Sequence, residues 1–174
     1  RLWFLDQLES QSAAYNISGA LRLTGPLNQN ALECAFHEIV KRHEILRTSF
    51  ISVDGNPIPV VEPGLTPSVE TVDLSGLPEG EKSESISRYM QETVNEPFDL
   101  SKTPLIRMKL LKVAVLDREI QNQNNLPTGE EHILCIVIHH IISDAWSIGI
   151  FVREMSILYE SFVDDNCSPL PELT

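Results

Sequence analysis

The sequence has few of the residues that would indicate a disulfide framework, a zinc site or a membrane segment. Its three cysteines, Cys34, Cys135 and Cys167, lie far apart and form no CxxC pair, so neither a zinc knuckle nor a set of disulfides is predicted. We therefore expect reduced thiols in a cytoplasmic protein. No apolar run approaches the roughly 18 residues that a membrane helix needs. The first residues also lack the charged start and apolar stretch of a signal peptide.

Basic residues are scarce as well. The chain has 13 lysines and arginines against 25 aspartates and glutamates, which gives a formal net charge of -12. This balance argues against binding to nucleic acid and against docking on an anionic membrane. The hydrophobic fraction of 42% and the charged fraction of 22% are those of a globular protein, and 174 residues suffice for one core.

Both ends of the sequence indicate a piece of a longer polypeptide. The chain does not begin with methionine, and the apolar pattern of residues 1–8 already predicts a short amphipathic helix or a turn. The last residues, 169–174, include two prolines and have the composition of a linker. We therefore expect residues 1–174 to be part of a larger protein.

Helices and strands are predicted to alternate along the chain. Apolar residues at helical spacing, with polar or acidic starts, predict helices over residues 28–42, 81–95 and 147–162. Alternating or continuous apolar segments predict strands over residues 15–23, 46–53, 58–62, 69–72, 105–116 and 132–139. A hairpin turn is expected at residues 54–57 and a polar loop at residues 117–131. This order predicts an α/β or α+β sandwich in which helices flank a mixed sheet.

Chemically useful side chains gather at the end of the last predicted strand. Its continuous apolar run is typical of a central strand buried on both faces, and His139, His140 and Asp144 follow at its end. Neighbouring side chains of a strand point to opposite faces, so the two histidines cannot both line one site. Histidine is a common base near neutral pH. From these residues alone, a strand-end histidine is either a catalyst or a satisfied core residue, and ligands for a histidine–cysteine metal site are missing.

Three segments of the sequence match one known family in their order. Residues 139–147 read HHIISDAWS, residues 1–8 read RLWFLDQL and residues 42–50 read RHEILRTSF. They resemble the HHxxxD core motif, the end of the first motif and the second motif of condensation domains from nonribosomal peptide synthetases, whose fold resembles chloramphenicol acetyltransferase. The chain is identified on this basis as the N-terminal subdomain, or lobe, of a condensation domain, with the C-terminal lobe absent.

The resemblance implies a reaction and its partners. Condensation domains join two thioester-bound substrates: the amine of an acceptor aminoacyl group attacks the thioester of a donor acyl or peptidyl group. Both groups are held on phosphopantetheine arms of peptidyl carrier proteins, so no directly bound cofactor and no metal are expected. The implied partners are the donor and acceptor carrier proteins, an adjacent adenylation domain and the C-terminal lobe. Because the later motifs belong to that lobe, we expect the 174 residues alone to be inactive.

The resemblance also assigns roles to individual residues. His140 is expected to orient or deprotonate the acceptor amine, either as a general base or as a positioning group. His139 is expected to be structural. Asp144 is expected to pair with an arginine, Arg42 or Arg47, and so to hold the loop in place.

The residues after Asp144 bear on substrate fit and on subtype. The family usually has glycine where this chain has Ala145, so we expect a functional loop with an altered fit to substrate. Trp146 is expected to pack within the protein rather than to form a platform for substrate, and Ser147 to cap the following helix. The order Asp-Ala-Trp-Ser favours an ordinary elongation domain that joins two L-configured residues over epimerization and heterocyclization relatives.

Two other functions remain open on the sequence. One is a free-standing acyltransferase of the same superfamily that uses coenzyme A thioesters. The other is a non-catalytic lobe that only docks carrier proteins, although the retention of His140, Asp144, Arg42 and Arg47 counts against it.

Overall fold

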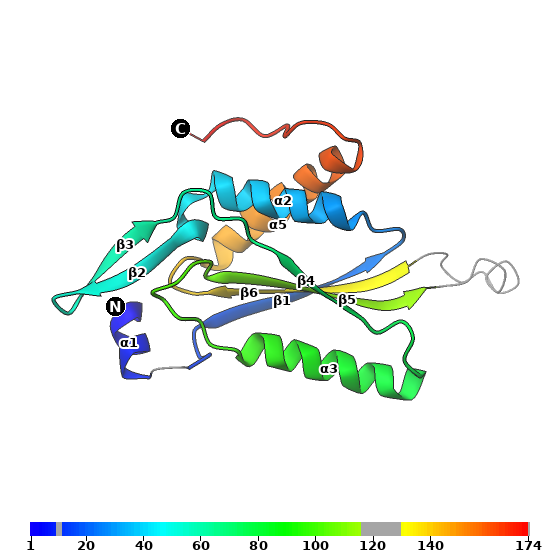
Figure 1. Cartoon of the computed structure of the whole chain (residues 1–174), viewed down its shortest axis with the longest axis horizontal. Coiled ribbons are helices and arrows are strands. Elements are labelled where there is room, and N and C mark those ends of the chain that lie inside the picture. Colours follow the sequence, from blue (N-terminus) through cyan, green and yellow to red (C-terminus); the bar gives the residue numbers. More distant parts are fainter. Residues whose placement is uncertain (10–11, 116–129, 174) are drawn as a thin grey trace, which may run out of the picture.

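The computed structural model describes residues 1–9, 12–115 and 130–173, with only the backbone described at residues 114–115 and 145–146 (Figure 1). Its central element is a four-stranded sheet in the order β1-β6-β5-β4. These strands span β1 (Asn16–Thr24), β4 (Val69–Asp73), β5 (Ile106–Val115) and β6 (Glu130–His139). The β1–β6 and β5–β6 pairs are antiparallel and the β4–β5 pair is parallel, so the mixed sheet predicted from the sequence is confirmed.

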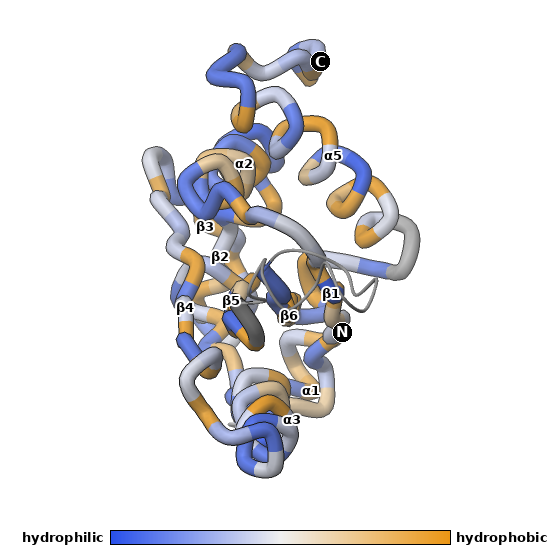
Figure 2. The backbone as a smooth tube through the Cα atoms, turned by 90° about the vertical axis from the view of Figure 1, so that its right-hand side faces the viewer, coloured by the Kyte–Doolittle hydropathy of each residue, from blue (hydrophilic) through white to orange (hydrophobic). Residues whose placement is uncertain are grey.

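Helices cover both faces of this sheet. The helical segments are α1 (Leu2–Leu8), α2 (Gln29–Arg42), the 3-10 turn η1 (Glu44–Arg47), α3 (Glu79–Asn95) and α5 (Ala145–Val163). Helices α2 and α5 lie on one face, and α1 and α3 lie on the other, which two perpendicular views show (Figures 1 and 2). The strands β2 (Thr48–Val53) and β3 (Asn56–Val61) form a separate two-stranded ribbon that extends from the α2 side.

Strand β6 is one of the two interior strands of the sheet and pairs with β1 on one side and β5 on the other. Ile138 of β6 lies opposite Ile17 of β1 and Ile106 of β5. Its apolar side chains fill the core on both faces, as the continuous apolar run predicted. Strand β6 begins at Glu130, two residues before the predicted start, and residues 117–129 of the predicted loop lie outside the described residues.

The strand predicted over residues 46–53 is wrong in its first part. Residues Glu44–Arg47 form the 3-10 turn η1, and β2 begins only at Thr48. The Thr48 hydroxyl donates to the carbonyl oxygen of Glu44 at 2.7 Å, which closes this turn. Leu46 is buried there, so a turn satisfies its apolar side chain as well as a strand would.

Helix α2 forms for the reason that its sequence indicates. The Asn28 side chain accepts a hydrogen bond from the backbone N–H of Ala31 at 3.0 Å and caps the helix. The residues that recur at helical spacing are all buried, namely Leu32, Ala35, Phe36, Ile39 and Val40. They pack in one core cluster with Phe151, Met155 and Leu158 of α5, so the two helices form one layer over the sheet.

The C-terminal end of α3 is fixed to the sheet by a half-buried arginine. Nη1 of Arg107, on β5, donates to the carbonyl oxygens of Thr93 and Glu96 at 3.3 and 2.6 Å, and Nη2 donates to Pro97 O at 3.1 Å. The guanidinium carbon also lies 3.8 Å from the ring centroid of Phe98. The last carbonyls of a helix have no partners within the helix and form its negative end. A cation therefore satisfies both their hydrogen bonding and their charge.

Replacing Arg107 with methionine is expected to destabilise the intact protein by about 2 to 4 kcal/mol, because several carbonyl oxygens lose a charged donor. Thermal unfolding would measure this change. Arg88→Met is the matched control on α3, where the arginine side chain is 60% exposed, and it should change stability by less than about 0.5 kcal/mol. Equal effects of the two substitutions would contradict the assignment.

Candidate active site

His140 lies in the turn that follows β6, and its side chain is exposed. Its backbone N–H donates to Tyr15 O at 2.8 Å, which ties the turn to the segment before β1. Nδ1 of the ring lies 2.7 Å from Ser143 O. A carbonyl oxygen only accepts hydrogen bonds, so Nδ1 must carry the proton. In the neutral ring Nε2 is then the unprotonated nitrogen, available to accept a proton or a hydrogen bond.

His139 has the opposite environment. It is the last residue of β6 and fully buried, and its ring centroid lies 6.2 Å from those of Tyr15 and Phe98. Nδ1 accepts a hydrogen bond from Ile141 N at 3.1 Å. Burial, with a smaller contribution from neighbouring His140, lowers the pKa of His139 to about 4. His139 is therefore a neutral ring that holds the turn from within, whereas His140 faces outward.

The protein is expected to lose stability as the pH falls from about 6.5 to about 4. The pKa of His139 is depressed from 6.5 to about 4 on folding, so over this range the unfolded chain binds a proton that the folded chain does not. Burial also lowers the pKa of His132 and adds to the effect with the same sign. Thermal unfolding across this range should show a smaller loss for His139→Gln than for the unchanged protein. An equal loss in both would contradict this origin.

Asp144 caps the helix that follows the turn. Its Oδ1 accepts hydrogen bonds from the backbone N–H of Ser147 at 2.8 Å and from the Ser147 hydroxyl at 2.7 Å. Ser147 is predicted to cap the helix, but the capping residue is Asp144. The reason is that α5 begins at Ala145, two residues before the predicted start. Ala145 has the helical conformation that alanine favours. The predictions for the side chains of Ala145 and Trp146 lie outside the described residues.

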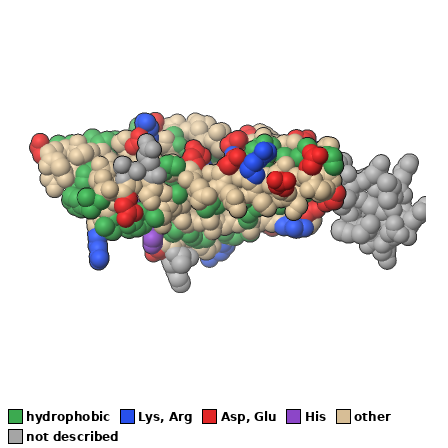
Figure 3. Space-filling view, turned by 90° about the horizontal axis from the view of Figure 1, so that it is seen from below, with side chains coloured by type: hydrophobic (Ala, Val, Ile, Leu, Met, Phe, Trp, Pro, Cys, Tyr) green, Lys and Arg blue, Asp and Glu red, His purple; other side chains and the backbone are tan. Residues whose placement is uncertain are grey.

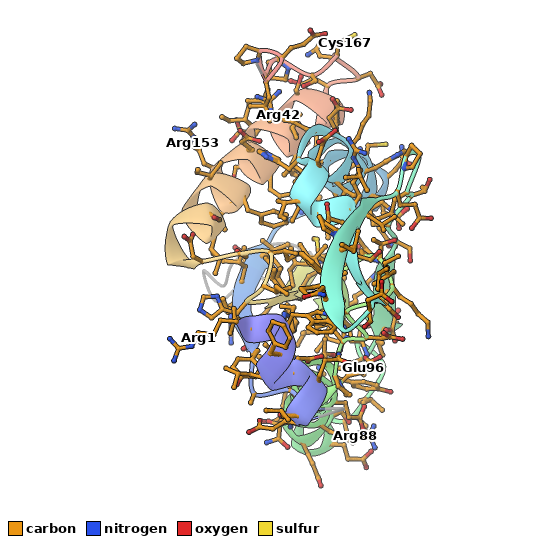
Figure 4. All side chains as sticks on the ribbon, turned by 90° about the vertical axis from the view of Figure 1, so that its left-hand side faces the viewer. Arg1, Arg42, Arg88, Glu96, Arg153 and Cys167 are labelled. Atoms are coloured by element: carbon orange, nitrogen blue, oxygen red, sulfur yellow. The ribbon has the colours of Figure 1, made fainter. Side chains whose placement is uncertain are left out.

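The two arginines of the second motif pair elsewhere than expected. Nε of Arg42 lies 3.3 Å from Oε2 of Glu154, and Nη2 of Arg47 lies 3.2 Å from Oε1 of Glu44. Neither ion pair leads to Asp144. Because a helix rises about 1.5 Å per residue, Glu154 lies roughly 15 Å further along α5 than Asp144. Arg42 at the end of α2 therefore meets α5 in its middle (Figure 4).

A buried carboxylate joins the second motif to α5. Oε2 of Glu154 lies 2.7 Å from Nε2 of His43 as well as near Arg42. The Glu154 side chain is only 7% exposed and that of Arg42 only 10%. Arg42 also donates to the carbonyl oxygen of Pro171. The second motif thus positions the helix that begins at the turn, instead of holding the turn through Asp144.

A pocket lies where the second and third motifs meet. It is lined by η1, the end of β6, the turn and the start of α5. Its walls are mostly apolar and include His43, Ile45, Leu46, Ile138, Ile142, Ser143, Ser147, Ile150 and Phe151. Two motifs far apart in the sequence therefore line one cavity next to the turn that bears His140.

Two structural findings concern other kinds of site. Within residues 1–9, 12–115 and 130–173, no three histidine, cysteine, aspartate or glutamate side chains are grouped as metal ligands would be. No helix in the described part of the chain is long and apolar enough to span a membrane.

The chain resembles known proteins in sequence and in fold. The family model for the condensation domain matches residues 1–174. A chondramide synthase from Chondromyces crocatus is 40% identical over 172 residues, which are 99% of this chain and 4% of that protein. A linear gramicidin synthase from Brevibacillus parabrevis is 39% identical over 174 residues, which are 100% of this chain and 3% of that protein. The chain thus spans a small part of these relatives.

Solved structures have the same fold. The starter condensation domain of rhizomide synthetase superposes with a TM-score of 0.81 at 20% identity, covering 99% of this chain and 40% of that one. The first condensation domain of the calcium-dependent antibiotic synthetase gives a TM-score of 0.77 at 24% identity, covering 99% and 38%. With the family model and the relatives, this likeness confirms the resemblance seen in the sequence. The chain belongs to the condensation-domain family of nonribosomal peptide synthetases.

Proposed function

We propose that this chain supplies the His140-bearing lobe of a centre that forms an amide bond during nonribosomal peptide synthesis. The donor is an acyl or peptidyl thioester, and the acceptor is an aminoacyl thioester with a free amine. The observation that supports this role is the hydrogen bond from Nδ1 of His140 to Ser143 O at 2.7 Å. It fixes the ring and leaves Nε2 as the acceptor on an exposed turn.

The reaction needs an oriented amine and an acceptor for one proton. The amine nitrogen attacks the donor carbonyl, the C–N bond forms, the C–S bond breaks, and the thiolate leaves. The nitrogen must lose a proton, and the leaving thiolate must gain one. Nε2 of His140 can accept a hydrogen bond from the amine and then the proton itself. Holding the two thioesters together contributes further to the rate, because it replaces an encounter in solution.

The substrates define the partners that we propose. Both acyl groups reach His140 on phosphopantetheine arms of donor and acceptor carrier proteins, next to an adenylation domain of the same cytoplasmic synthetase. The C-terminal lobe of the condensation domain completes the site. Apolar side chains are exposed on α1, namely Phe4, Leu5 and Leu8, and hydrophobic side chains gather at that end of the α3 face (Figure 3). This surface is available to another part of the synthetase.

The test uses the condensation domain with both lobes and carrier proteins loaded with donor and acceptor groups. Intact-protein mass spectrometry should show the donor group appearing on the acceptor arm, with equal loss from the donor arm. Residues 1–174 without the second lobe should show no transfer. Transfer only from a coenzyme A thioester would replace this proposal with a free-standing acyltransferase. Carrier binding without any transfer would favour a docking role.

A further inference from the structure

Helix α1 carries a buried carboxylate for which the proposed reaction gives no role. Two residues of this short helix are buried, Trp3 and Asp6, and Asp6 is only 8% exposed. Burial raises the pKa of Asp6, and a hydrogen bond with the side chain of Gln7 opposes this rise. Nearby Asp99 raises it further. A buried carboxylate is costly unless it interacts with a polar group, so its surroundings indicate what it does.

The group that Asp6 faces is the imidazole of His139. Oδ1 of Asp6 lies 3.9 Å from Nε2 of His139. Nε2 is fully buried and has no hydrogen-bond partner within the described part of the chain. Because Nδ1 of the same ring accepts from Ile141 N at 3.1 Å, the single proton of the neutral ring is on Nε2. Among the described residues, the only charged group within 4 Å of Nε2 is the carboxylate of Asp6.

The position of that proton controls the turn. With the proton on Nε2, Nδ1 is free to accept from Ile141 N. With the proton on Nδ1, two N–H groups would face each other and this hydrogen bond would be lost. The same turn is closed by Ile142 N donating to His139 O at 3.1 Å. It continues directly to Ser143 O, the acceptor that orients His140.

We propose that Asp6 is a positioning residue for His140, acting through His139. The distance of 3.9 Å is longer than a hydrogen bond, so the carboxylate acts as a nearby negative charge that favours the N–H at Nε2. That preference keeps Nδ1 as the acceptor for Ile141 and thereby fixes the turn. Asp6 belongs to the first motif and His139 to the third, so this contact gives the first motif a role in the site. The inference rests on the proposed function of His140.

The first measurement is the tautomer of His139 in the complete condensation domain, from the 15N shifts of its ring nitrogens. The unchanged protein should show Nε2–H and an unprotonated Nδ1. Asp6→Leu, which removes the charge, should give a mixture of tautomers or Nδ1–H. Asp6→Asn, which removes the charge at nearly unchanged size, should have the same effect, whereas Asp6→Glu retains a carboxylate and should keep the Nε2–H form. Asp6→Ala repeats the test if the leucine variant does not fold.

The second measurement is single-turnover transfer between loaded carriers. Asp6→Leu should lower its rate about 10- to 100-fold, because the reacting ring is displaced. The carrier concentration for half-maximal rate should stay the same, and Asp6→Glu, which keeps the charge, should recover most of the rate. Glu9→Gln, at the exposed end of the same helix, is the matched control and should change neither rate nor tautomer.

The outcomes separate this inference from the proposed function. A lower rate in Asp6→Leu with an unchanged His139 tautomer would overturn the inference, because the effect would then be structural. A native rate in that variant would also overturn it. If the unchanged domain folds but transfers nothing, the proposed function fails, and with it the role of Asp6, even where the tautomer responds as expected.

Discussion

Replacing His140 with alanine in the complete condensation domain is expected to lower the rate of transfer by about 100- to 10 000-fold. The alanine removes Nε2, which is the proton acceptor on the exposed turn. Alanine retains the backbone N–H that donates to Tyr15 O, and the cap of α5 is made by Asp144 and Ser147, which are unchanged. Single-turnover transfer between loaded carriers, followed by intact-protein mass spectrometry, measures the change.

The matched control for this variant is His37→Ala. His37 is an exposed histidine on α2 and belongs to none of the three motifs, so its loss should leave the rate within about twofold of the unchanged protein. A tenfold or smaller loss in His140→Ala would show that His140 is no general base. The rate would then come mainly from holding the two thioesters together.

Replacing Glu154 with alanine is expected to destabilise the domain by about 3 to 5 kcal/mol. The reason is the buried guanidinium of Arg42, whose side chain is 10% exposed and would lose its partner carboxylate. His43 would lose the same oxygen, 2.7 Å from its Nε2. Thermal and denaturant unfolding measure the change. The exposed carboxylate of Glu160, on the same helix, is the matched control and should alter stability by less than about 0.5 kcal/mol.

A double substitution tests whether the uncompensated charge causes this loss. Arg42→Met combined with Glu154→Ala should be more stable than Glu154→Ala alone, because the buried cation is gone. Equal stability of the single and double variants would point to lost packing along α5 as the cause. The transfer rate of Glu154→Ala should also fall, since Arg42 and His43 fix the helix that begins at the His140 turn.

The sheet can be predicted from the sequence because its strands have strong local patterns. The apolar run that ends at His139 predicts β6, and Asn28 predicts the start of α2. The predicted start of α5 is two residues late because both Asp144 and Ser147 are good capping residues. The 3-10 turn before Thr48 is not predicted because a short apolar segment does not distinguish a turn from the beginning of a strand.

The contacts of the site are harder to predict because they join distant segments. The three motifs point to the residues but not to their partners: Arg42 or Arg47 is expected to pair with Asp144, whereas Arg42 pairs with Glu154 and Arg47 with Glu44. Glu154 has one local signal, a carboxylate on the face of α5 that also carries Phe151 and Leu158. Asp6 has none, because its burial depends on where α1 packs. Partner choice of this kind follows from tertiary packing and not from spacing along the chain.

The pairing of β1 with β6 also sets an order for biosynthesis. Asn16 lies opposite His139, and Thr24 lies opposite Glu131, so β1 has no partner until residues 131–139 have left the ribosome. At 5–20 residues per second this wait lasts on the order of ten seconds. Helix α2 and the β2–β3 ribbon join segments close in sequence and can form during that time. The His140 turn is bound to Tyr15 O, so it takes its shape only when the segment around Tyr15 meets the much later segment that follows β6.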